Sequence, residues 1–486
     1  MKHLMRGVVL VLASFNFAIL VTGCATNPAT GASDVVLMSE QQELALGRQT
    51  DPKVREQYGV YPLPALQAYV QQVGEQLAAH SHRPNLIYRF TVLDSAEVNA
   101  FALPGGYIYI TRGILAYLNS EAELAAVLGH EIGHVTARHA VRQYTAATAT
   151  GLAIALLGGG QAGQQLMGVI GNALLSGYGR DHELQADHLG AEYLARTGYD
   201  PQAMFGVMTV LKNQEEAEKK RAAAEGREPH IYHGVFASHP SADQRLQEVV
   251  ADAAKFKTAA TTRIARDEYL LHLDNVVFGD SAREGIRRGA NFYHRDLNFA
   301  ISFPSGWHIE NTPRAVNAFS PAKDATMQLS MEDLNQRMTP QEYLRKRVQA
   351  NAFADESTLG NGTMPSHTAV ARLNTPFGVR DTRVIVVFQN NRAFTFFGAA
   401  KDEATFRQAD SQFLAAGRSL HALVDKERAI AEGLRLRIVK ARSGDTFAAL
   451  AKRSPLSNYA ELTLRLINDK FPSGEPVAGE LVKIVE

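Results

Sequence analysis

The sequence predicts a multidomain protein of the α+β class, on three observations. The chain has 486 residues, too many for one ordinary hydrophobic core. Residues 38–262 carry mostly long helical patterns, whereas residues 285–422 carry short alternating runs typical of strands. Residues 436–486 begin and end with strand-like runs around two helical segments. We therefore expect a mainly helical domain with a small edge-stranded sheet, then a small antiparallel-sheet domain and a βααβ module.

The N-terminus has the pattern of a targeting segment. Lys2 and Arg6 precede an apolar run over residues 8–21, which is short for a membrane span. Residues 20–24, LVTGC, then fit a lipobox, and Cys24 is the only cysteine in the chain. We expect a signal peptide over 1–23 and a lipid anchor on Cys24, with a plain transmembrane anchor as the alternative. Because no aspartate follows Cys24, we expect the periplasmic face of a bacterial outer membrane.

The segment up to residue 118 predicts alternating helices and strands after a small, polar tether over residues 24–37. Ser39 and Gln42 have capping-box spacing at the start of the first helix. In chain order, we expect helices over 39–58 and 63–80, strands over 87–93 and 107–110, and a helix over 112–118.

The pattern His130-Glu131-x-x-His134 lies inside a predicted helix from about residue 120 to 142. This helix opens with the capping-box pattern S-x-x-E at residues 120–123. Because residues four apart share a helix face, His130 and His134 can present two imidazoles to one metal ion. Glu131 lies beside them as a carboxylate base. The arrangement is typical of zinc hydrolases, with chance occurrence as the alternative.

A zinc site needs a third protein ligand, and a second helical pattern over residues 181–198 offers one. Glu183 and Asp187 are four apart, so both can face the metal helix. Residues 99–106, NAFALPGG, lead into the predicted strand 107–110. A strand edge beside a metal can hold an extended peptide by main-chain hydrogen bonds. The residues expected to bind the substrate are Asn99, Ala100, Phe101, Ala102, Leu103, Pro104 and Gly105.

Four motifs, HEIGHVTARH, NAFALPGG, RDHELQAD and SHPSADQR, occur in the context of a known family. Over about residues 34–262 the chain resembles the HtpX/BepA-like zinc metallopeptidases, relatives of the CAAX prenyl proteases. The resemblance implies a zincin-type (gluzincin) domain with one Zn²⁺ per chain. By position it assigns zinc binding to His130, His134 and Glu183. It assigns water activation to Glu131 and orientation of a ligand to Asp187.

The resemblance also concerns residues that lie far along the chain from the metal motif. His239 matches a loop histidine that can approach the metal in periplasmic members, and Arg245 matches the arginine that follows it. As a fourth ligand, His239 would keep the enzyme latent; as a mobile donor, it would stabilise the oxyanion. Both readings stay open. Gln185 stands where many relatives have an acidic residue, which should leave metal binding unchanged.

Two further segments of the first domain are unusual in composition. Residues 148–178 contain two apolar runs around Gly158-Gly159-Gly160, each too short to span a bilayer. We expect buried helices over the active site, with a mobile lid or membrane-contacting flap as the alternative. Residues 215–227 are dense in charge and predict a solvated helix or a loop.

The rest of the chain predicts two smaller units. Residues 285–422 contain no recognisable metal or nucleophile constellation. Residues 436–486 resemble a LysM module, a type that often binds N-acetylglucosamine glycans, so peptidoglycan is the expected partner and a packing role the alternative. The expected order is signal peptide 1–23, tether 24–37, metallopeptidase domain 38–262, linker 263–284, α+β domain 285–422, linker 423–435 and LysM-like module 436–486.

The charge balance excludes one class of partner. The chain has 50 basic and 50 acidic residues, so nothing indicates nucleic acid. The sequence therefore predicts a lipid-anchored zinc metalloendopeptidase that cleaves misfolded or stalled envelope proteins. Two alternatives remain: a latent protease fold that acts as a chaperone or cell-wall scaffold, and a zinc hydrolase for a substrate other than protein.

Overall fold

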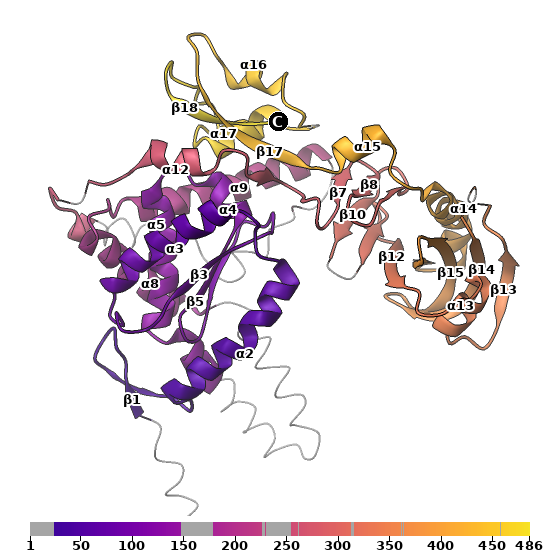
Figure 1. The fold of residues 1–486 in the computed structure, drawn as a ribbon, viewed down its shortest axis with the longest axis horizontal. Coiled ribbons are helices and arrows are strands. Elements are labelled where there is room, and N and C mark those ends of the chain that lie inside the picture. The colour runs from indigo at the N-terminus through magenta and orange to yellow at the C-terminus, as the bar shows by residue number, and fades with distance from the viewer. Residues whose placement is uncertain are drawn as a thin grey trace, which may run out of the picture. The chain divides into compact units, whose positions relative to one another are not determined.

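A computed structural model describes most of the chain from residue 24 on (Figure 1). The described residues are 24–146, 178–225, 229, 254–260, 262–312, 315–360, 362, 364–456 and 458–486. They fall into two compact units. The first comprises the described residues up to Val276 together with Arg435–Glu486, and the second is Val277–Leu434.

Residues 24–37, expected as a tether, contain a short hairpin of β1 (Cys24–Thr26) and β2 (Ser33–Val35). The Asn27 side chain forms the turn, because its Oδ1 atom accepts a hydrogen bond from the backbone N–H of Ala29 at 2.9 Å. The two helices that follow confirm the prediction: α2 (Glu40–Tyr58), with the Ser39–Gln42 capping box, and α3 (Pro64–Ala79).

The small sheet of the first unit has the strand order β3-β5-β4. We expected the strand after Gly106 to supply the edge, and this is wrong. β5 (Tyr107–Thr111) is central, between the parallel β3 (Arg89–Leu93) and the antiparallel β4 (Ala100–Leu103). The polypeptide reverses through Gly105 and Gly106, whose φ angles of 82° and 85° favour glycine. The edge strand that packs against the metal helix is therefore β4 itself.

The helix that carries the metal motif is shorter than expected. After α4 (Arg112–Tyr117), α5 covers Glu121–Thr136, and residues 139–146 form a separate helical segment. The break falls at Arg138, whose φ of 54° lies in the left-handed region. Only half of the predicted capping box is present. Ser120 Oγ accepts from the N–H of Glu123, but the Glu123 carboxylate accepts from Asn119.

Three more described helices of the first unit precede its C-terminal segment. α8 (Arg180–Arg196) carries Glu183, and α9 (Ala203–Glu225) includes most of the charged segment that we predicted as a helix or a loop. α12 (Arg266–His272) follows later in the chain. Within the described residues, no helix has the length and apolar character needed to cross a bilayer. The predicted helices or lid over 148–178 and the loop that contains His239 and Arg245 lie outside the described residues, Tyr178 excepted.

The second unit confirms the predicted antiparallel sheet with helices. Its seven-stranded sheet has the order β10 (His308–Asn311), β11 (Val316–Phe319), β12 (Ala325–Asp333), β16 (Arg392–Ala400), β15 (Gly378–Gln389), β14 (Ser366–Thr375) and β13 (Phe353–Ser357). The other elements are β6 (Val277–Phe278), β7 (Ile286–Arg288), β8 (Asn291–His294), β9 (Phe299–Ser302), α13 (Pro340–Arg347), α14 (Glu403–Ser419) and α15 (Asp425–Ile430).

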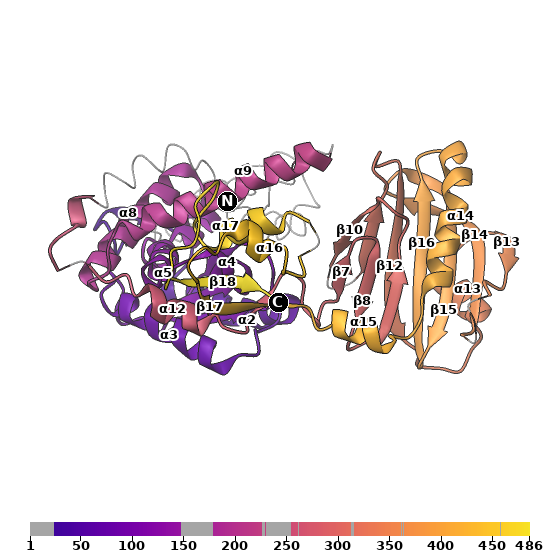
Figure 2. The same cartoon turned by 90° about the horizontal axis from the view of Figure 1, so that it is seen from above.

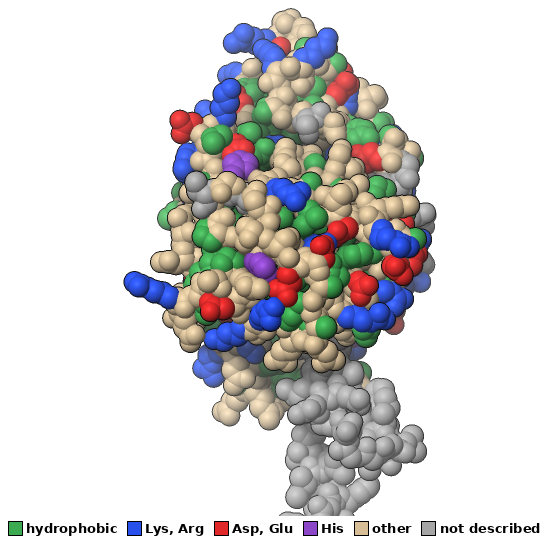
Figure 3. All heavy atoms as spheres, turned by 90° about the vertical axis from the view of Figure 1, so that its right-hand side faces the viewer, with side chains coloured by type: hydrophobic (Ala, Val, Ile, Leu, Met, Phe, Trp, Pro, Cys, Tyr) green, Lys and Arg blue, Asp and Glu red, His purple; other side chains and the backbone are tan. Residues whose placement is uncertain are grey.

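The seven-stranded sheet is covered on both faces, by α14 and by α13 (Figure 2). Successive side chains of its central strands point to opposite faces, so each face supplies apolar residues to a core. Ile385 and Val387 of β15 belong to a core that includes Phe413 of α14. Val384 and Val386 belong to a second core that includes Leu344 of α13. On the face drawn in Figure 3, acidic and basic side chains are interspersed, in keeping with the balanced composition.

The C-terminal residues form the predicted strand–helix–helix–strand order: β17 (Leu434–Lys440), α16 (Phe447–Ala451), α17 (Ala460–Ile467) and β18 (Leu481–Val485). The Asn468 side chain fastens α17 to β18, because it bonds to the backbone of both Leu464 and Lys483. Lys220 and Arg221 of α9 contact Phe471 and Thr463. These contacts join residues 435–486 to the rest of the first unit.

Lys483 makes the most deeply buried of these contacts. Its Nζ atom donates to the carbonyl oxygens of Ala116, at 2.9 Å, and Leu118, at 2.7 Å, at the end of α4. Burial lowers the pKa of Lys483 to about 7, although Glu123 partly opposes this shift. Lys483 thus contacts the chain just before the metal helix α5 begins.

We predict that Lys483→Met destabilises the chain, because two buried carbonyls lose their donor at a cost of about 1–3 kcal/mol. The wild-type free energy of unfolding should also rise with pH above about 7. Between the folded pKa of about 7 and the ordinary lysine value of 10.5, the unfolded chain binds more protons than the folded chain. Urea unfolding at several pH values measures both effects, with the exposed Lys440→Met as the control. Equal stability and equal pH slopes in both variants would contradict this role.

Candidate metal centre

Three buried side chains from two helices converge at one point. The Nε2 atoms of His130 and His134 on α5 are 2.9 Å apart. On α8, Glu183 Oε2 lies 3.6 Å from His130 Nε2, and Glu183 Oε1 lies 3.5 Å from His134 Nε2. Among the described residues, these three form the one His/Cys/Asp/Glu group suited to hold a metal ion. The structure therefore brings together the three predicted ligands.

The donor set fits zinc in both chemistry and spacing. Two imidazoles and a carboxylate are ligands that zinc prefers, and a catalytic site leaves a fourth position open. With zinc–ligand bonds of about 2.0–2.2 Å, a tetrahedral ion separates its ligand atoms by roughly 3.3–3.6 Å. The observed separations of 2.9–3.6 Å lie within a few tenths of an ångström of these values.

Close packing of glycines sets the distance between α5 and α8. A Cβ atom built on Gly133 would lie 2.9 Å from the Ala186 carbonyl oxygen, and one on Gly190 would lie 3.0 Å from the His130 nitrogen. Neither position has room for a side chain without a shift of the backbone. The glycines therefore let Glu183 reach the two histidines.

Asp187 holds the first histidine ligand, as the resemblance implied. Its Oδ1 atom lies 2.8 Å from His130 Nδ1. If Nδ1–H donates to this carboxylate, the Nε2 lone pair points at the metal position. Burial alone would lower the pKa of His130, but Asp187, Glu183 and Glu131 together raise it. The carboxylates thus favour a ring that is a proton donor at Nδ1.

The second histidine ligand has its own support, which sequence reasoning missed. His134 Nδ1 lies 2.8 Å from His139 Nδ1, and His139 Nε2 lies 2.9 Å from Gln185 Oε1. Burial lowers the pKa of His139 to about 3, so this ring is neutral. Because Gln185 Oε1 can only accept, His139 Nε2–H must donate to it, and the other nitrogen of this neutral ring must accept. His134 Nδ1–H therefore donates to His139 Nδ1. The Nε2 atom of His134 is left to bind metal.

A helical pattern alone does not bring His139 to His134, since residues five apart do not share a helix face. The break at Arg138 does so, because it re-aims the chain after α5. Arg138 is held in place by a 2.9 Å ion pair with the buried Glu43 and by a hydrogen bond to the Met38 carbonyl. The only signal in the sequence was a third histidine in the segment HEIGHVTARH.

Tyr178 is a second residue that sequence reasoning missed. Its ring stacks on His134, with centroids 4.0 Å apart and planes 20° apart. Burial raises the pKa of Tyr178, and the charges of Glu131 and Glu183 raise it further, so its hydroxyl keeps its proton. Tyr178, His134, Leu103 and Pro104 line one small cavity. The end of the β4 edge strand and one of the three predicted ligands, His134, therefore line the same cavity.

The remaining predicted site residues have different outcomes. Glu131 is buried beside His130 on α5, and its negative charge acts on both His130 and Tyr178. Ala100, Ala102 and Leu103 are buried in β4, while the Phe101 ring stacks on Tyr109. Asn99 precedes β4, and its carbonyl accepts from the N–H of Thr111. What β4 can offer a peptide is thus its main chain.

Comparison with known proteins agrees with this geometry. Residues 64–253 match the model of Peptidase family M48. Over this segment the chain is similar to the M48 peptidases. The matched segment includes both histidine ligands, Glu131 and Glu183, so it contains the convergent side chains of α5 and α8.

Individual relatives match over a similar stretch. The chain is 30% identical over 249 residues to the "Beta-barrel assembly-enhancing protease" of Yersinia pestis, covering 48% of each chain. It is 30% identical over 238 residues to the protein of that name in Escherichia coli strain K12, covering 46% of each. It is 30% identical over 203 residues to the "Mitochondrial metalloendopeptidase OMA1" of Schizosaccharomyces pombe, covering 40% of this chain and 57% of the relative. The chain thus spans about half the length of the curated relatives it matches.

We predict that His139→Ala weakens zinc binding by roughly 10- to 100-fold, as loss of a group that orients a metal ligand does. Competition with a chromophoric chelator measures the zinc Kd directly. His80→Ala is the matched control, because His80 is exposed and its ring Nδ1 bonds to the Gln76 carbonyl of α3. An unchanged zinc Kd in a folded His139→Ala protein would show that His134 needs no such support.

Proposed function

We propose that this chain is a zinc-dependent metalloendopeptidase of the bacterial cell envelope. The observation that supports this proposal most directly is the convergence of His130, His134 and Glu183 beside the end of the β4 strand. Among the described residues, the outer edge of β4 pairs with no further strand. Such a strand edge near a metal position suits an extended peptide substrate better than a small molecule. The M48 match of residues 64–253 supports the same reaction class.

In the proposed mechanism, the protein positions the substrate and moves the proton. Zinc, when held by His130, His134 and Glu183, would supply Lewis-acid polarisation of the scissile carbonyl and activate water. The peptide would extend along residues 100–105, with its carbonyl directed to the metal position. The Glu131 carboxylate would accept a proton from the attacking water and pass it to the leaving amine. Asp187 and His139 would keep the His130 and His134 rings oriented toward the metal position during the reaction.

The proposed substrates are misfolded or stalled envelope proteins. Two relatives carry a name that refers to enhancing β-barrel assembly, which supports a role in envelope protein quality control. We propose further that Cys24 carries a lipid anchor, that the protein faces the periplasm at the outer membrane, and that residues 436–486 are a LysM-like module able to bind peptidoglycan. The βααβ order of that segment supports the last point.

We predict that Glu131→Gln abolishes proteolysis while the protein still binds one zinc ion. The amide keeps the size of the carboxylate but cannot accept the proton, so activity should fall at least 100-fold. Casein cleavage and metal analysis measure the two properties. Glu192→Gln, on α8 but paired with Arg196, is the matched control.

Retained cleavage by Glu131→Gln would rule out this mechanism. If this variant instead rescues a deletion strain as well as the wild type does, then the chain acts as a chaperone or scaffold.

We also predict that His239→Ala cleaves casein faster than the wild type, if His239 fills the fourth metal position in a latent enzyme. The test uses the chain without its leader and Cys24, with zinc content measured in parallel. His230→Ala, a change in the same region of the sequence, is the control. A slower His239→Ala enzyme with full zinc content would instead assign His239 to oxyanion stabilisation.

A further inference from the structure

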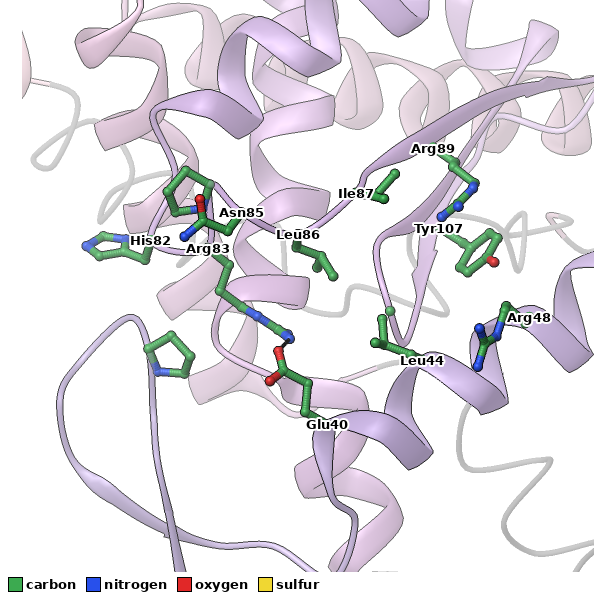
Figure 4. A pocket seen from close by; sticks show the side chains of 13 residues that line it. Glu40, Leu44, Arg48, His82, Arg83, Asn85, Leu86, Ile87, Arg89 and Tyr107 are labelled. Carbon is green, nitrogen blue, oxygen red and sulfur yellow. Dashed lines mark hydrogen bonds and ion pairs between the residues drawn. The ribbon is translucent and has the colours of Figure 1, made fainter.

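A separate cavity of about 540 Å³ lies in the first unit, between the start of α2, the loop before β3 and the β4–β5 turn (Figure 4). We call it the arginine pocket. The lining residues that matter here are Glu40, Arg48, Arg83, Ile87, Arg89 and Tyr107. None of them belongs to the metal centre, and the proposed proteolysis does not use them.

One arginine is fixed in the pocket by carboxylates. Arg83 Nη2 lies 2.7 Å from Glu40 Oε1, and Arg83 Nη1 lies 2.8 Å from Oε1 of the buried Glu43. Glu43 also binds Arg138, as described for the break after α5. Arg83 is therefore held in position by this network.

The other two arginines are exposed and lie on either side of the Tyr107 ring (Figure 4). The Arg89 guanidinium carbon is 5.0 Å from the ring centroid, a cation–π distance. In the described parts of the chain, no carboxylate lies within ion-pair distance of Arg48 or Arg89. With three arginines against Glu40 alone, the lining carries an excess of positive charge.

The pocket also has an apolar rim. Ile87 is 67% exposed, an unusual exposure for a large aliphatic side chain, and Leu44 and Leu86 line the cavity beside it. Guanidinium groups that form no ion pair with the described residues and lie next to apolar side chains suit a ligand that is itself amphipathic. A phosphate that carries a hydrophobic tail has this chemistry.

The position of the pocket in the chain indicates where such a ligand would come from. Pro28 lines the pocket only four residues after Cys24. Four extended residues span at most about 14 Å. If Cys24 is lipid-anchored, the pocket is held next to the membrane surface, where anionic headgroups are concentrated.

We propose that the arginine pocket binds the phosphate headgroup of an anionic membrane lipid, with Arg48 and Arg89 as its direct partners and Ile87 against the acyl boundary. Guanidinium groups bind phosphate in a fixed, bidentate geometry. Binding here would orient the M48 domain on the membrane. The inference depends on the proposed anchor for location, but the test does not.

The experiment measures binding of residues 24–486 with Cys24→Ser, made without the leader, to lipid vesicles by co-sedimentation. The vesicles are phosphatidylcholine alone or with one-third phosphatidylglycerol. We expect binding only to the anionic vesicles, weakened roughly 10- to 30-fold by Arg48→Ala/Arg89→Ala. Arg48→Lys/Arg89→Lys should keep most of the binding. Arg372→Ala/Arg407→Ala removes the same charge from side chains that are 71% and 72% exposed in the second unit, and should bind as the wild type does.

Several outcomes would overturn the proposal. Absence of binding to the anionic vesicles, or equal losses in the two alanine pairs, would leave no specific lipid site. Inorganic phosphate bound as tightly as the vesicles, and lost in Arg48→Ala/Arg89→Ala, would make the pocket a site for a soluble anion. If Arg48→Ala/Arg89→Ala raises the KM for acidic peptides and leaves vesicle binding unchanged, then the arginine pocket is a substrate subsite. Because vesicle binding needs no proteolysis, failure of the proposed enzymatic function would be seen separately, in casein cleavage.

Discussion

The close approach of α5 and α8 is the constraint on which the metal centre depends. It exists because Gly133 faces the Ala186 carbonyl and Gly190 faces the backbone of His130 with no space for a side chain between them. At this separation a glutamate on one helix reaches two histidines on the other. Larger residues at these glycines would move the helices apart, and the three ligand atoms would no longer meet at one ion.

A second constraint is the left-handed conformation of Arg138, which ends the metal helix. A non-glycine residue with a φ of 54° is strained, so its neighbours must hold it. The buried Glu43 does this, and it binds Arg83 with its other oxygen. The Glu43 carboxylate thereby links Arg138, which positions His139 beside His134, to Arg83, which lines the arginine pocket. A displacement of Arg83 in the proposed membrane-facing pocket would therefore act on Arg138, and so on the support of His134, through one side chain.

A third constraint is the attachment of the C-terminal residues, 435–486, near the start of the metal helix. They are fastened to the protease part of the chain through Lys483 and through contacts with α9. The lysine donates to carbonyls just before the metal helix begins. If residues 436–486 bind peptidoglycan as proposed, the glycan would be held by a part of the same compact unit as the active site.

Much of the catalytic constellation could be predicted from the sequence, because it depends on local periodicity. Spacing of four residues on a helix put His130 and His134 together, and the same spacing put Glu183 and Asp187 on one face. Helix caps and the strand alternation in the second unit are equally local, and most of these predictions were confirmed. The lipid anchor, the roles of His239 and Arg245 and the glycan site remain predictions from motifs.

Tertiary structure decided the features that depend on contacts between distant segments. Which strand forms the edge is settled by pairing, and β4 rather than β5 takes that place. The support of His134 by His139 and Gln185 needs both a helix break and a second helix, neither of which a periodic pattern shows. The arginine pocket joins residues from four separate stretches of the chain, from Pro28 to Tyr107. The sequence determined the chemical groups and their local spacing, and long-range packing determined which of them meet.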